Sequence, residues 1–348
     1  MGALGSSAPA GTGPWRGRRV LVTGGSGFVG SWLAQELVDA GAEVIGLIRD
    51  QVRGSWLERS GTAHRMTLVS GDIEDLACVQ RALNEYSVTA VFHLAAQSQV
   101  GVANRSPLST WHANILGTCH VLEACRTLPG GQLGALIVAS SDKAYGEQPL
   151  PYTEERALLG RNPYDASKAC TDVLAQTYAK TYGMPIGIAR CANIYGGGDL
   201  NFNRLIPETI RALANDQRPI IRSDGKFLRD YLYIDDAVQA YLALGQAVLG
   251  GLHHGEAFNF GADHPTSVLE VVRLLLEASD HPTLEPDIRN EARGEIRDQY
   301  LSSAKAARVL GWKARMPLQE GLRQTVQWYQ RYRPWEESGE DARVSAHA

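Results

Sequence analysis

Two groups of acid and base side chains stand out in the sequence. Tyr164 and Lys168 are four residues apart. On a helix they share one face, where the ammonium can lower the pKa of the phenol and make it a general base. Ser140-Ser141-Asp142-Lys143 ends an apolar run and adds a second acid/base pair. One pair is enough to move a hydride, whereas two indicate an enzyme that also removes a proton and expels a leaving group.

A glycine-rich stretch, Thr23-Gly-Gly-Ser-Gly-Phe-Val-Gly30, lies between a β-branched run and a stretch of helical period. Its glycines allow a tight turn, close backbone approach to a pyrophosphate, and close packing of helix on sheet. The helix N-terminus supplies amides and a positive dipole. An ordinary glycine turn is the alternative, but the strand before it and the helix after it favour a dinucleotide site. The candidate contacts are Gly24, Ser26, Gly27, Phe28, Val29 and Gly30.

The end of the next predicted strand is expected to meet the adenosine ribose. Asp50, about twenty residues beyond the last glycine, can hold the 2′-hydroxyl of NAD. Arg49 can instead pair with the 2′-phosphate of NADP. Because Ile48 occupies the last strand position, the sequence slightly favours NADP. Asp72 and Ile73 follow the third strand and can approach the adenine, with a helix cap as the alternative role for Asp72.

His93-Leu-Ala-Ala-Gln97 closes the fourth strand with small side chains, which let a nicotinamide lie against the backbone. Leu94, Ala95, Ala96 and Gln97 are therefore candidate cofactor contacts, together with Tyr164 and Lys168. Tight packing against a helix is an equal alternative for Ala96. Asn114, inside a predicted helix, is costly unless its amide bonds to backbone. It either bridges to the catalytic lysine or has a purely structural role.

These positions suggest separate catalytic roles. Tyr164 takes the proton from a substrate hydroxyl while a hydride passes to the nicotinamide. Lys168 bonds the nicotinamide ribose, and Ser141 orients the reacting oxygen. Asp142 and Lys143 stand at the carboxyl end of a predicted central strand, where exposure means exposure to the substrate. A catalytic role for this pair is therefore favoured over a surface ion pair.

Polar residues beyond the strands are candidate substrate contacts. Arg229 and Arg293 can clamp a diphosphate, although either arginine alone is more often a surface residue. The full candidate set is Gln97, Ser98, Asn193, Asn203, Arg204, Arg229 and Arg293. His253-His254 has no partners at metal-ligand spacing, so no metal site is predicted.

Apolar strand-like runs alternate with helical stretches up to about residue 190. Nearly all-apolar strands in this alternation predict an α/β fold, a doubly wound parallel Rossmann sheet covered on both faces, with ligands at the carboxyl ends of its strands. The expected strands are Arg19–Val22, Glu43–Ile48, Met66–Val69, Val88–Leu94, Ala135–Ala139 and Pro185–Arg190. The expected helices are Phe28–Ala40, Pro107–Arg126 and one that begins at Pro163.

Beyond Arg190 the pattern changes to a smaller, α-rich lobe. Its expected helices cover Leu205–Ala214, Val268–Ala278, Ser302–Leu310 and Leu318–Tyr332. We predict a disordered tail over residues 1–16 and a dinucleotide-binding domain over 17–192, with 230–260 interleaved. A substrate-binding lobe is predicted over 193–333 and a frayed tail over 334–348.

Composition excludes several classes of function. A formal net charge of −4, without a basic stripe that alternates with aromatic residues, gives no electrostatic case for nucleic acid. No apolar run approaches the ~20 residues that cross a bilayer. The five cysteines form no Cys-x-x-Cys pair and indicate reduced thiols in a cytoplasmic protein.

The motifs together resemble the extended short-chain dehydrogenase/reductase superfamily over nearly all of residues 18 to 332. The similar segments are Thr-Gly-Gly-Ser-Gly-Phe-Val-Gly (23–30), His-Leu-Ala-Ala-Gln (93–97), Asn-Ile-Leu-Gly-Thr (114–118), Pro-Tyr-Asp-Ala-Ser-Lys (163–168) and Arg-Asp-Tyr (229–231). Ser-Asp-Lys before Ala-Tyr-Gly is similar to the nucleotide-sugar 4,6-dehydratase branch, closest to CDP-glucose 4,6-dehydratases. So are Trp15-Arg-Gly and Gly-Ser-Trp-Leu33. Epimerases of the superfamily usually carry small or hydroxyl residues in place of Asp142 and Lys143.

This resemblance implies a tightly held NAD or NADP, a nucleoside-diphosphate-sugar substrate, a 4-keto-6-deoxy product and a homodimer. It implies Asp142 as the acid for a departing C6 hydroxyl and Lys143 as the C5 base or enolate stabiliser. The base and sugar stay open, because Ala-Tyr-Gly-Glu147 is less aromatic than in CDP-glucose enzymes. The strand end Gly46–Arg49 resembles NADP-using GDP-mannose dehydratases. The alternatives are a nucleotide-sugar 4-epimerase and a non-catalytic dinucleotide-binding protein.

Overall fold

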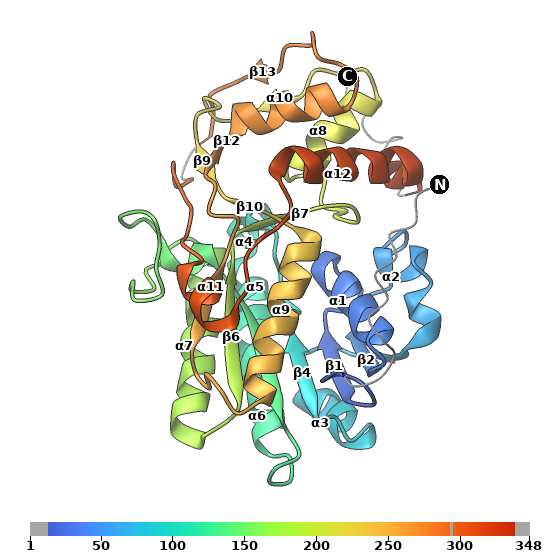
Figure 1. The fold of residues 1–348 in the computed structure, drawn as a ribbon, viewed down its shortest axis with the longest axis vertical. Coiled ribbons are helices and arrows are strands. Elements are labelled where there is room, and N and C mark those ends of the chain that lie inside the picture. The colour runs from blue at the N-terminus through green and yellow to red at the C-terminus, as the bar shows by residue number, and fades with distance from the viewer. Residues whose placement is uncertain (1–12, 293–294, 338–348) are drawn as a thin grey trace.

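Seven parallel strands form the central sheet in a computed structural model that describes residues 13–292 and 295–337 (Figure 1). The strand order is β11-β6-β5-β4-β1-β2-β3, and every neighbouring pair is parallel. The predicted doubly wound sheet is confirmed. The strands are β1 (Arg19–Thr23), β2 (Glu43–Ile48), β3 (Thr67–Ser70), β4 (Ala90–His93), β5 (Ala135–Ser141), β6 (Ile186–Cys191) and β11 (Ala257–Phe260).

Helices cover both faces of this sheet, which explains why its strands are almost wholly apolar. Successive strand side chains point to opposite faces. Val20 and Val22 of β1 therefore pack in the core that includes α1 (Phe28–Asp39) and α9 (Ile234–Leu249). Leu21 between them joins the opposite core, which includes side chains of α3 (Leu76–Glu85), α6 (Gly117–Arg126) and α7 (Pro163–Tyr182).

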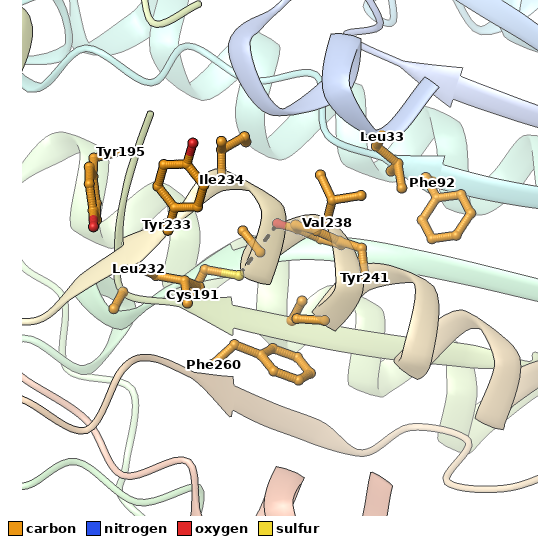
Figure 2. Packing of buried hydrophobic residues seen from close by; sticks show 14 of the residues in the cluster. Leu33, Phe92, Cys191, Tyr195, Leu232, Tyr233, Ile234, Val238, Tyr241 and Phe260 are labelled. Carbon is orange, nitrogen blue, oxygen red and sulfur yellow. Dashed lines mark hydrogen bonds between the residues drawn. The ribbon is translucent and has the colours of Figure 1, made fainter. Parts of the chain in front are cut away.

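The chain returns to the sheet after leaving it. Strand β11 pairs with β6, and α9 packs against β5 and β6. Figure 2 shows the side chains at this junction, where the Tyr241 hydroxyl of α9 lies 3.7 Å from Cys191 Sγ of β6. Val238 and Phe260 pack in the same core. Residues far apart in sequence thus support the central strands from one side.

An α-rich lobe lies beyond one end of the sheet (Figure 1). Its helices are α8 (Leu205–Ala214), α10 (Val268–Ala278) and α12 (Leu318–Tyr332), and α10 packs on both of the others. Two pairs of short strands lie between the sheet and these helices: β7 (Asn193–Tyr195) with β10 (Tyr231–Tyr233), and β9 (Leu228–Arg229) with β12 (Thr266–Ser267). A third pair, β8 (Ile220–Ile221) with β13 (Asp287–Ile288), belongs to the lobe itself.

The other elements are short. Helix α2 (Trp56–Arg59) packs on α1, the 3₁₀ turn η1 (Thr62–Arg65) on β3, α4 (Val100–Arg105) on α7 and α11 (Ala304–Leu310) on β11. Helix α13 (Pro334–Glu337) follows α12.

The helix predicted over Pro107–Arg126 is not continuous. A π-helical segment, η2 (His112–Leu116), separates α5 (Pro107–Trp111) from α6. The Asn114 carbonyl inside it accepts hydrogen bonds from the hydroxyls of Thr118 and Thr171, at 2.6 and 3.0 Å. Hydroxyl groups that bond backbone carbonyls in this way compete with the regular ladder. The interruption turns the Asn114 side chain toward β4 and α7.

Both ends of the described chain differ from the predicted tails. Trp15 lies within the predicted disordered tail, yet it is only 4% exposed and packs against Phe92 of β4. The predicted frayed tail begins with helix α13, whose Trp335 is 1% exposed and stacks on Tyr329. A large aromatic side chain gains enough from burial to order a short polar segment. Residues 1–12 and 338–348 lie outside the described residues.

Among the helices of the described chain, none combines the length and the apolar character needed to cross a membrane.

Candidate active site

Two elements bring the predicted catalytic residues together at the carboxyl end of β5. Strand β5 ends at Ser141, and a 3₁₀ turn, η3 (Asp142–Tyr145), follows at once. Helix α7 begins at Pro163, a residue suited to the first turn of a helix. It packs on η3 and on β5. Tyr164 and Lys168 in its first two turns therefore face the end of the strand.

Ser141 connects the two acid/base pairs. Its hydroxyl donates to Asp142 Oδ1 at 3.0 Å and caps η3 by accepting from the Lys143 backbone amide at 3.2 Å. It also makes a side-chain hydrogen bond with Tyr164. The three catalytic candidates Ser141, Asp142 and Tyr164 thus form one connected group.

Asp142 is buried with one oxygen unused. Its residue is 2% exposed, and Oδ2 has no hydrogen-bond partner among the described residues. A buried polar atom without a partner costs free energy, so such atoms concentrate where a ligand or reaction needs them. This oxygen is suited to act on a substrate group.

The Lys143 side chain contacts a segment that is distant in the sequence. Its Nζ donates to the side-chain oxygen of Gln299 at 2.5 Å. The amide nitrogen of Gln299 lies 3.4 Å from the Asp142 carbonyl oxygen. The sequence did not predict this contact. Gln299 is 156 residues from Lys143, and no motif around it indicates that the two side chains meet.

Tyr164 differs from the prediction in its electrostatics. Burial raises the pKa of its phenol to about 12, opposed first by the Arg204 guanidinium and also by the hydrogen bond with Ser141. Lys168 Nζ donates to the Ala139 carbonyl at 2.8 Å. Arg204, predicted as a substrate contact, is the cation that acts on the phenol.

Burial also acts on Lys168. It lowers the pKa of the ammonium to about 8, opposed by the nearby Cys191 and Asp172 side chains. Its charge in turn helps to hold the pKa of fully buried His93 down to about 3, after burial as the main cause. His93 is therefore neutral and bonds the hydroxyls of Thr23 and Thr118 at 2.8 and 3.0 Å. Its role is to join β1, β4 and α6.

Asn114 connects the segment after β4 to α7. Its side-chain oxygen accepts from the Gln97 amide at 2.7 Å, and its nitrogen donates to the Gln97 carbonyl at 3.1 Å and to Ser167 Oγ at 2.8 Å. These bonds hold Gln97 in place beside α7. The contacts support the structural alternative for Asn114, since no side-chain bond from it to Lys168 occurs in the described structure.

A buried hydrogen-bond network connects η3 to β6, α7 and β11. Arg190 of β6 forms a two-pronged ion pair with Asp172 of α7, at 2.8 and 2.9 Å. The same guanidinium donates to the Tyr145 hydroxyl at 2.8 Å. That hydroxyl donates to the side-chain oxygen of Asn259 in β11 at 2.7 Å. The sequence reasoning missed this network, although an arginine inside an apolar strand was a visible signal.

The glycine-rich loop has the geometry that a dinucleotide pyrophosphate requires. Gly24 adopts a φ of +72° and lies against the Ala95 backbone, and a Cβ on Gly30 would collide with the Gly24 carbonyl. Gly27 precedes α1 without any side-chain cap. The first amides of α1, at Phe28 and Val29, therefore point outward and can bind an anion. The loop fits the predicted cofactor.

The predicted ribose contacts cluster at the end of β2. Arg49 pairs with Asp50 at 2.8 Å and lies 4.0 Å from Asp72, with its side chain 62% exposed. Ser26 Oγ donates to the Asp50 carbonyl at 3.2 Å. The helix-cap alternative for Asp72 is wrong, because Asp75 caps α3 and Asp72 accepts from the Glu74 amide.

Ile73 lies 6% exposed in the core beneath α3 and α6, where it packs against Gly117. The side chains of Leu94, Ala95 and Ala96 are half-buried beside the glycine-rich loop. The Ala95 amide donates to Thr23 Oγ1 at 3.2 Å.

The predicted substrate contacts divide into two groups. Arg204 donates to Asp199 at 2.9 Å and lies 3.4 Å from Ser98 Oγ, close to Tyr164. Asn203 beside it is exposed. Asn193 and Arg229 lie in the small strands that join sheet and lobe. Arg293 lies outside the described residues.

Arg229 is occupied by backbone rather than free. Its guanidinium donates to the carbonyls of Ile296 and Arg297, both at 2.7 Å, and its side chain is 12% exposed. It therefore fixes the segment that leads to Gln299, which is a role that the sequence reasoning did not predict.

Comparisons with known proteins agree with this arrangement. The family model described as GDP-mannose 4,6 dehydratase matches residues 21–325. The CDP-glucose 4,6-dehydratase of Salmonella typhimurium is 31% identical, over 90% of this chain and 91% of that protein.

Solved structures show the same architecture. The dTDP-glucose 4,6-dehydratase of Streptomyces venezuelae, with NAD bound, has a TM-score of 0.81 and 29% identity, and covers 91% of this chain and 98% of that one. The UDP-glucose 4-epimerase of Thermotoga maritima, with UDP-glucose, has a TM-score of 0.82 and 28% identity, with coverages of 90% and 99%. The resemblance predicted from the motifs is confirmed, and the chain belongs to the GDP-mannose 4,6-dehydratase family.

Proposed function

We propose that this protein is a nucleoside-diphosphate-sugar 4,6-dehydratase that produces a 4-keto-6-deoxy sugar nucleotide. The observation that carries the proposal is the joined group of Ser141, Asp142 and Tyr164, with Lys143 beside it. Hydride transfer alone does not need Asp142 or Lys143, whereas elimination of water needs both an acid and a base. CDP-glucose is the substrate to test first, because a CDP-glucose 4,6-dehydratase is among the most similar relatives.

The residues divide the reaction between them. The glycine-rich loop at Gly24, Gly27 and Gly30 would hold NAD or NADP, which would supply the acceptor for the C4 hydride and the donor of that hydride to C6. Tyr164 takes the C4 hydroxyl proton, Lys143 takes the C5 proton, and Asp142 gives a proton to the C6 hydroxyl, which leaves as water. Lys143 then returns its proton to C5, so the substrate loses one water overall.

Ser141 completes the proton balance. After one turnover Tyr164 has gained a proton and Asp142 has lost one. The Ser141 hydroxyl bonds to both side chains and offers a path by which the proton returns. Both acid/base pairs are thereby ready for the next substrate.

The 4-epimerase alternative is supported by the similarity to the Thermotoga maritima epimerase. An epimerase reverses a 4-keto intermediate and returns hydride to C4, a reaction that leaves Asp142 and Lys143 without a task. The buried, unpartnered oxygen of Asp142 favours the dehydratase.

We propose NAD as the cofactor. The slight preference for NADP from the sequence is not confirmed, since Arg49 already pairs with Asp50 and lies near Asp72. A 2′-phosphate would meet two carboxylates as well as one guanidinium, and like charges repel. NAD, which has a free 2′-hydroxyl, suits this group better.

We propose a homodimer through α5–α7. Large apolar side chains on these elements are exposed in the single chain, at Leu108, Trp111, Leu116, Val173 and Tyr182. Several exposed apolar side chains on neighbouring helices are typical of an interface. A second copy offers the same face, as two-fold symmetry requires.

We also propose a dinucleotide-binding domain over residues 17–192, with 230–260 interleaved, a substrate-binding lobe over 193–333, and a cytoplasmic location. The five free cysteines support the location, because thiols stay reduced in the cytoplasm. The proposed substrate contacts are Gln97, Ser98, Asn193, Asn203, Arg204 and Arg293. Arg229 instead holds the neighbouring backbone.

Dehydration is tested with CDP-glucose, GDP-mannose, UDP-sugars and dTDP-sugars, with mass spectrometry to detect a product lighter by one water. Asp142→Asn and Lys143→Ala should each slow dehydration by at least about 100-fold, because each removes one proton-transfer group. A 4-epimer product with no water loss from any substrate would overturn the proposal.

The pH dependence of kcat/KM tests the role of Lys168. Burial disfavours the ammonium, so the charged form is lost as the pH rises through about 8. Since the ammonium donates a stronger hydrogen bond than the neutral amine to a nicotinamide ribose or a carbonyl, the rate should fall above that pH. Lys168→Arg should be slower but should lose this descending limb, because guanidinium stays charged. If the descending limb of the kcat/KM profile persists in Lys168→Arg, it belongs to another titrating group. His93 is excluded as that group, because its pKa is about 3.

Mass spectrometry of the dinucleotide released on denaturation tests the cofactor. We expect NAD, and we expect Arg49→Ala to change NAD affinity by less than about 3-fold, an effect below one hydrogen bond. A 2′-phosphate on the released dinucleotide would contradict the proposal.

Light scattering after gel filtration tests the dimer. Leu108→Glu together with Val173→Glu should give a monomer, because buried unpaired charges are costly. Leu252→Glu is the matched control, since Leu252 is equally exposed but lies beyond α9. A monomeric unmodified protein would refute the proposed interface.

A further inference from the structure

We propose that Gln299 is a positioning residue for the elimination step, whose side-chain amide holds the Lys143 amine beside Asp142. This inference rests on the proposed dehydratase function. It assigns a role to a residue outside both acid/base pairs, brought to the site by the tertiary fold alone.

The contacts of Gln299 fix the orientation of its amide. The residue is 1% exposed. Its oxygen accepts from Lys143 Nζ at 2.5 Å, and its nitrogen faces the Asp142 carbonyl at 3.4 Å. A lysine ammonium only donates and a carbonyl only accepts, so the reversed amide would face two mismatched partners. The planar amide of Gln299 therefore fixes the distance between the Asp142 backbone and the Lys143 amine.

A neutral acceptor suits a lysine that must exchange a proton. An amide oxygen can accept an N–H from either the ammonium or the neutral amine, so it holds the side chain throughout the reaction. A carboxylate in its place would favour the ammonium and oppose proton removal from C5. Two carboxylates already lie near Lys143, Asp142 on its own turn and Asp165 on α7. The amide positions the amine without a third negative charge.

The backbone of Gln299 is held as firmly as its side chain. Its amide donates to the Leu228 carbonyl at 3.0 Å, and Asp298 Oδ1 accepts from the Leu228 amide at 3.1 Å. Arg229 holds the carbonyls of Ile296 and Arg297. The backbone that carries Gln299 is therefore held by both residues of β9, Leu228 and Arg229.

Gln299→Leu puts an apolar side chain, shorter by one methylene, in place of the amide and removes both hydrogen bonds. We expect kcat for dehydration to fall by about 10- to 100-fold, as misplacement of a reacting group does, with KM within about 3-fold. Oxidation at C4 does not involve Lys143. Reduced nicotinamide should therefore accumulate in a single turnover, seen by its absorbance. Gln132→Leu, whose amide bonds the Val88 carbonyl at 3.1 Å ahead of β4, is the matched control and should behave as the unmodified enzyme.

Gln299→Glu keeps the shape and changes only the charge. A carboxylate beside the Lys143 amine should favour its ammonium form, so dehydration should be slower at neutral pH and should recover as the pH rises. Lysine-selective ¹³C NMR follows the charge of this side chain without any turnover, and the chain offers only Lys143, Lys168, Lys180, Lys226, Lys305 and Lys313 to assign. Lys143→Arg identifies the signal.

Several results would overturn the inference. Unchanged kcat in Gln299→Leu, or an equal loss of C4 oxidation and dehydration, would show a bystander or a purely structural residue. If Gln299→Leu does not fold, Gln299→Glu still tests the inference. A Lys143 NMR signal and a pH profile of kcat that both match those of the unmodified enzyme would overturn it. If the unmodified protein dehydrates no sugar nucleotide, the proposed function fails, while the NMR titration still decides the contact between Gln299 and Lys143.

Discussion

The buried ion pair between Arg190 and Asp172 is the interaction on which the candidate site depends. It joins β6 to α7, and through Tyr145 it also holds the turn that carries Asp142 and Lys143. Two charges buried in this way need each other, since loss of one partner costs about 3–5 kcal/mol. Their pairing therefore holds α7 against β6, next to the end of β5. The same helix places Tyr164 beside Ser141 and Lys168 Nζ on the Ala139 carbonyl.

Burial then sets the chemistry of the groups that this frame aligns. The same loss of water raises the pKa of Tyr164 and lowers that of Lys168. Both shifts favour the neutral forms, and Arg204 acts against the first of them. Proton transfer to and from Tyr164 therefore depends on the charge of Arg204, a proposed substrate contact. Asp142, with one oxygen unpartnered, belongs to the same poorly solvated surroundings.

The smaller lobe contributes to catalysis as well as to binding. Arg229 and Leu228 hold the segment of Ile296 to Gln299 against the end of the sheet. That segment delivers an amide to Lys143 across the boundary between the two parts of the chain. Strand β11 and helix α9 cross the same boundary in the other direction. The two parts are therefore linked at the site itself.

Much of the fold was predictable because it depends on local pattern. Apolar strands such as Arg19–Thr23 and helices such as Leu205–Ala214 and Val268–Ala278 follow from periodicity. The π-helical segment around Asn114 and the ordered Trp15 and Trp335 were not predictable, because each depends on contacts with distant residues.

For the candidate site, the sequence by itself determined the reacting groups. Ser141, Asp142 and Lys143 are neighbours in the chain, and Tyr164 and Lys168 share a helical face, so short-range geometry was enough to associate them. Only the tertiary structure decided what surrounds these groups. Arg204 near the phenol, Arg190 beneath the turn and Gln299 on the lysine all come from remote segments. Hydrogen bonds and charge effects depend on distance in space, and residues that are remote in the sequence become neighbours only in the folded chain.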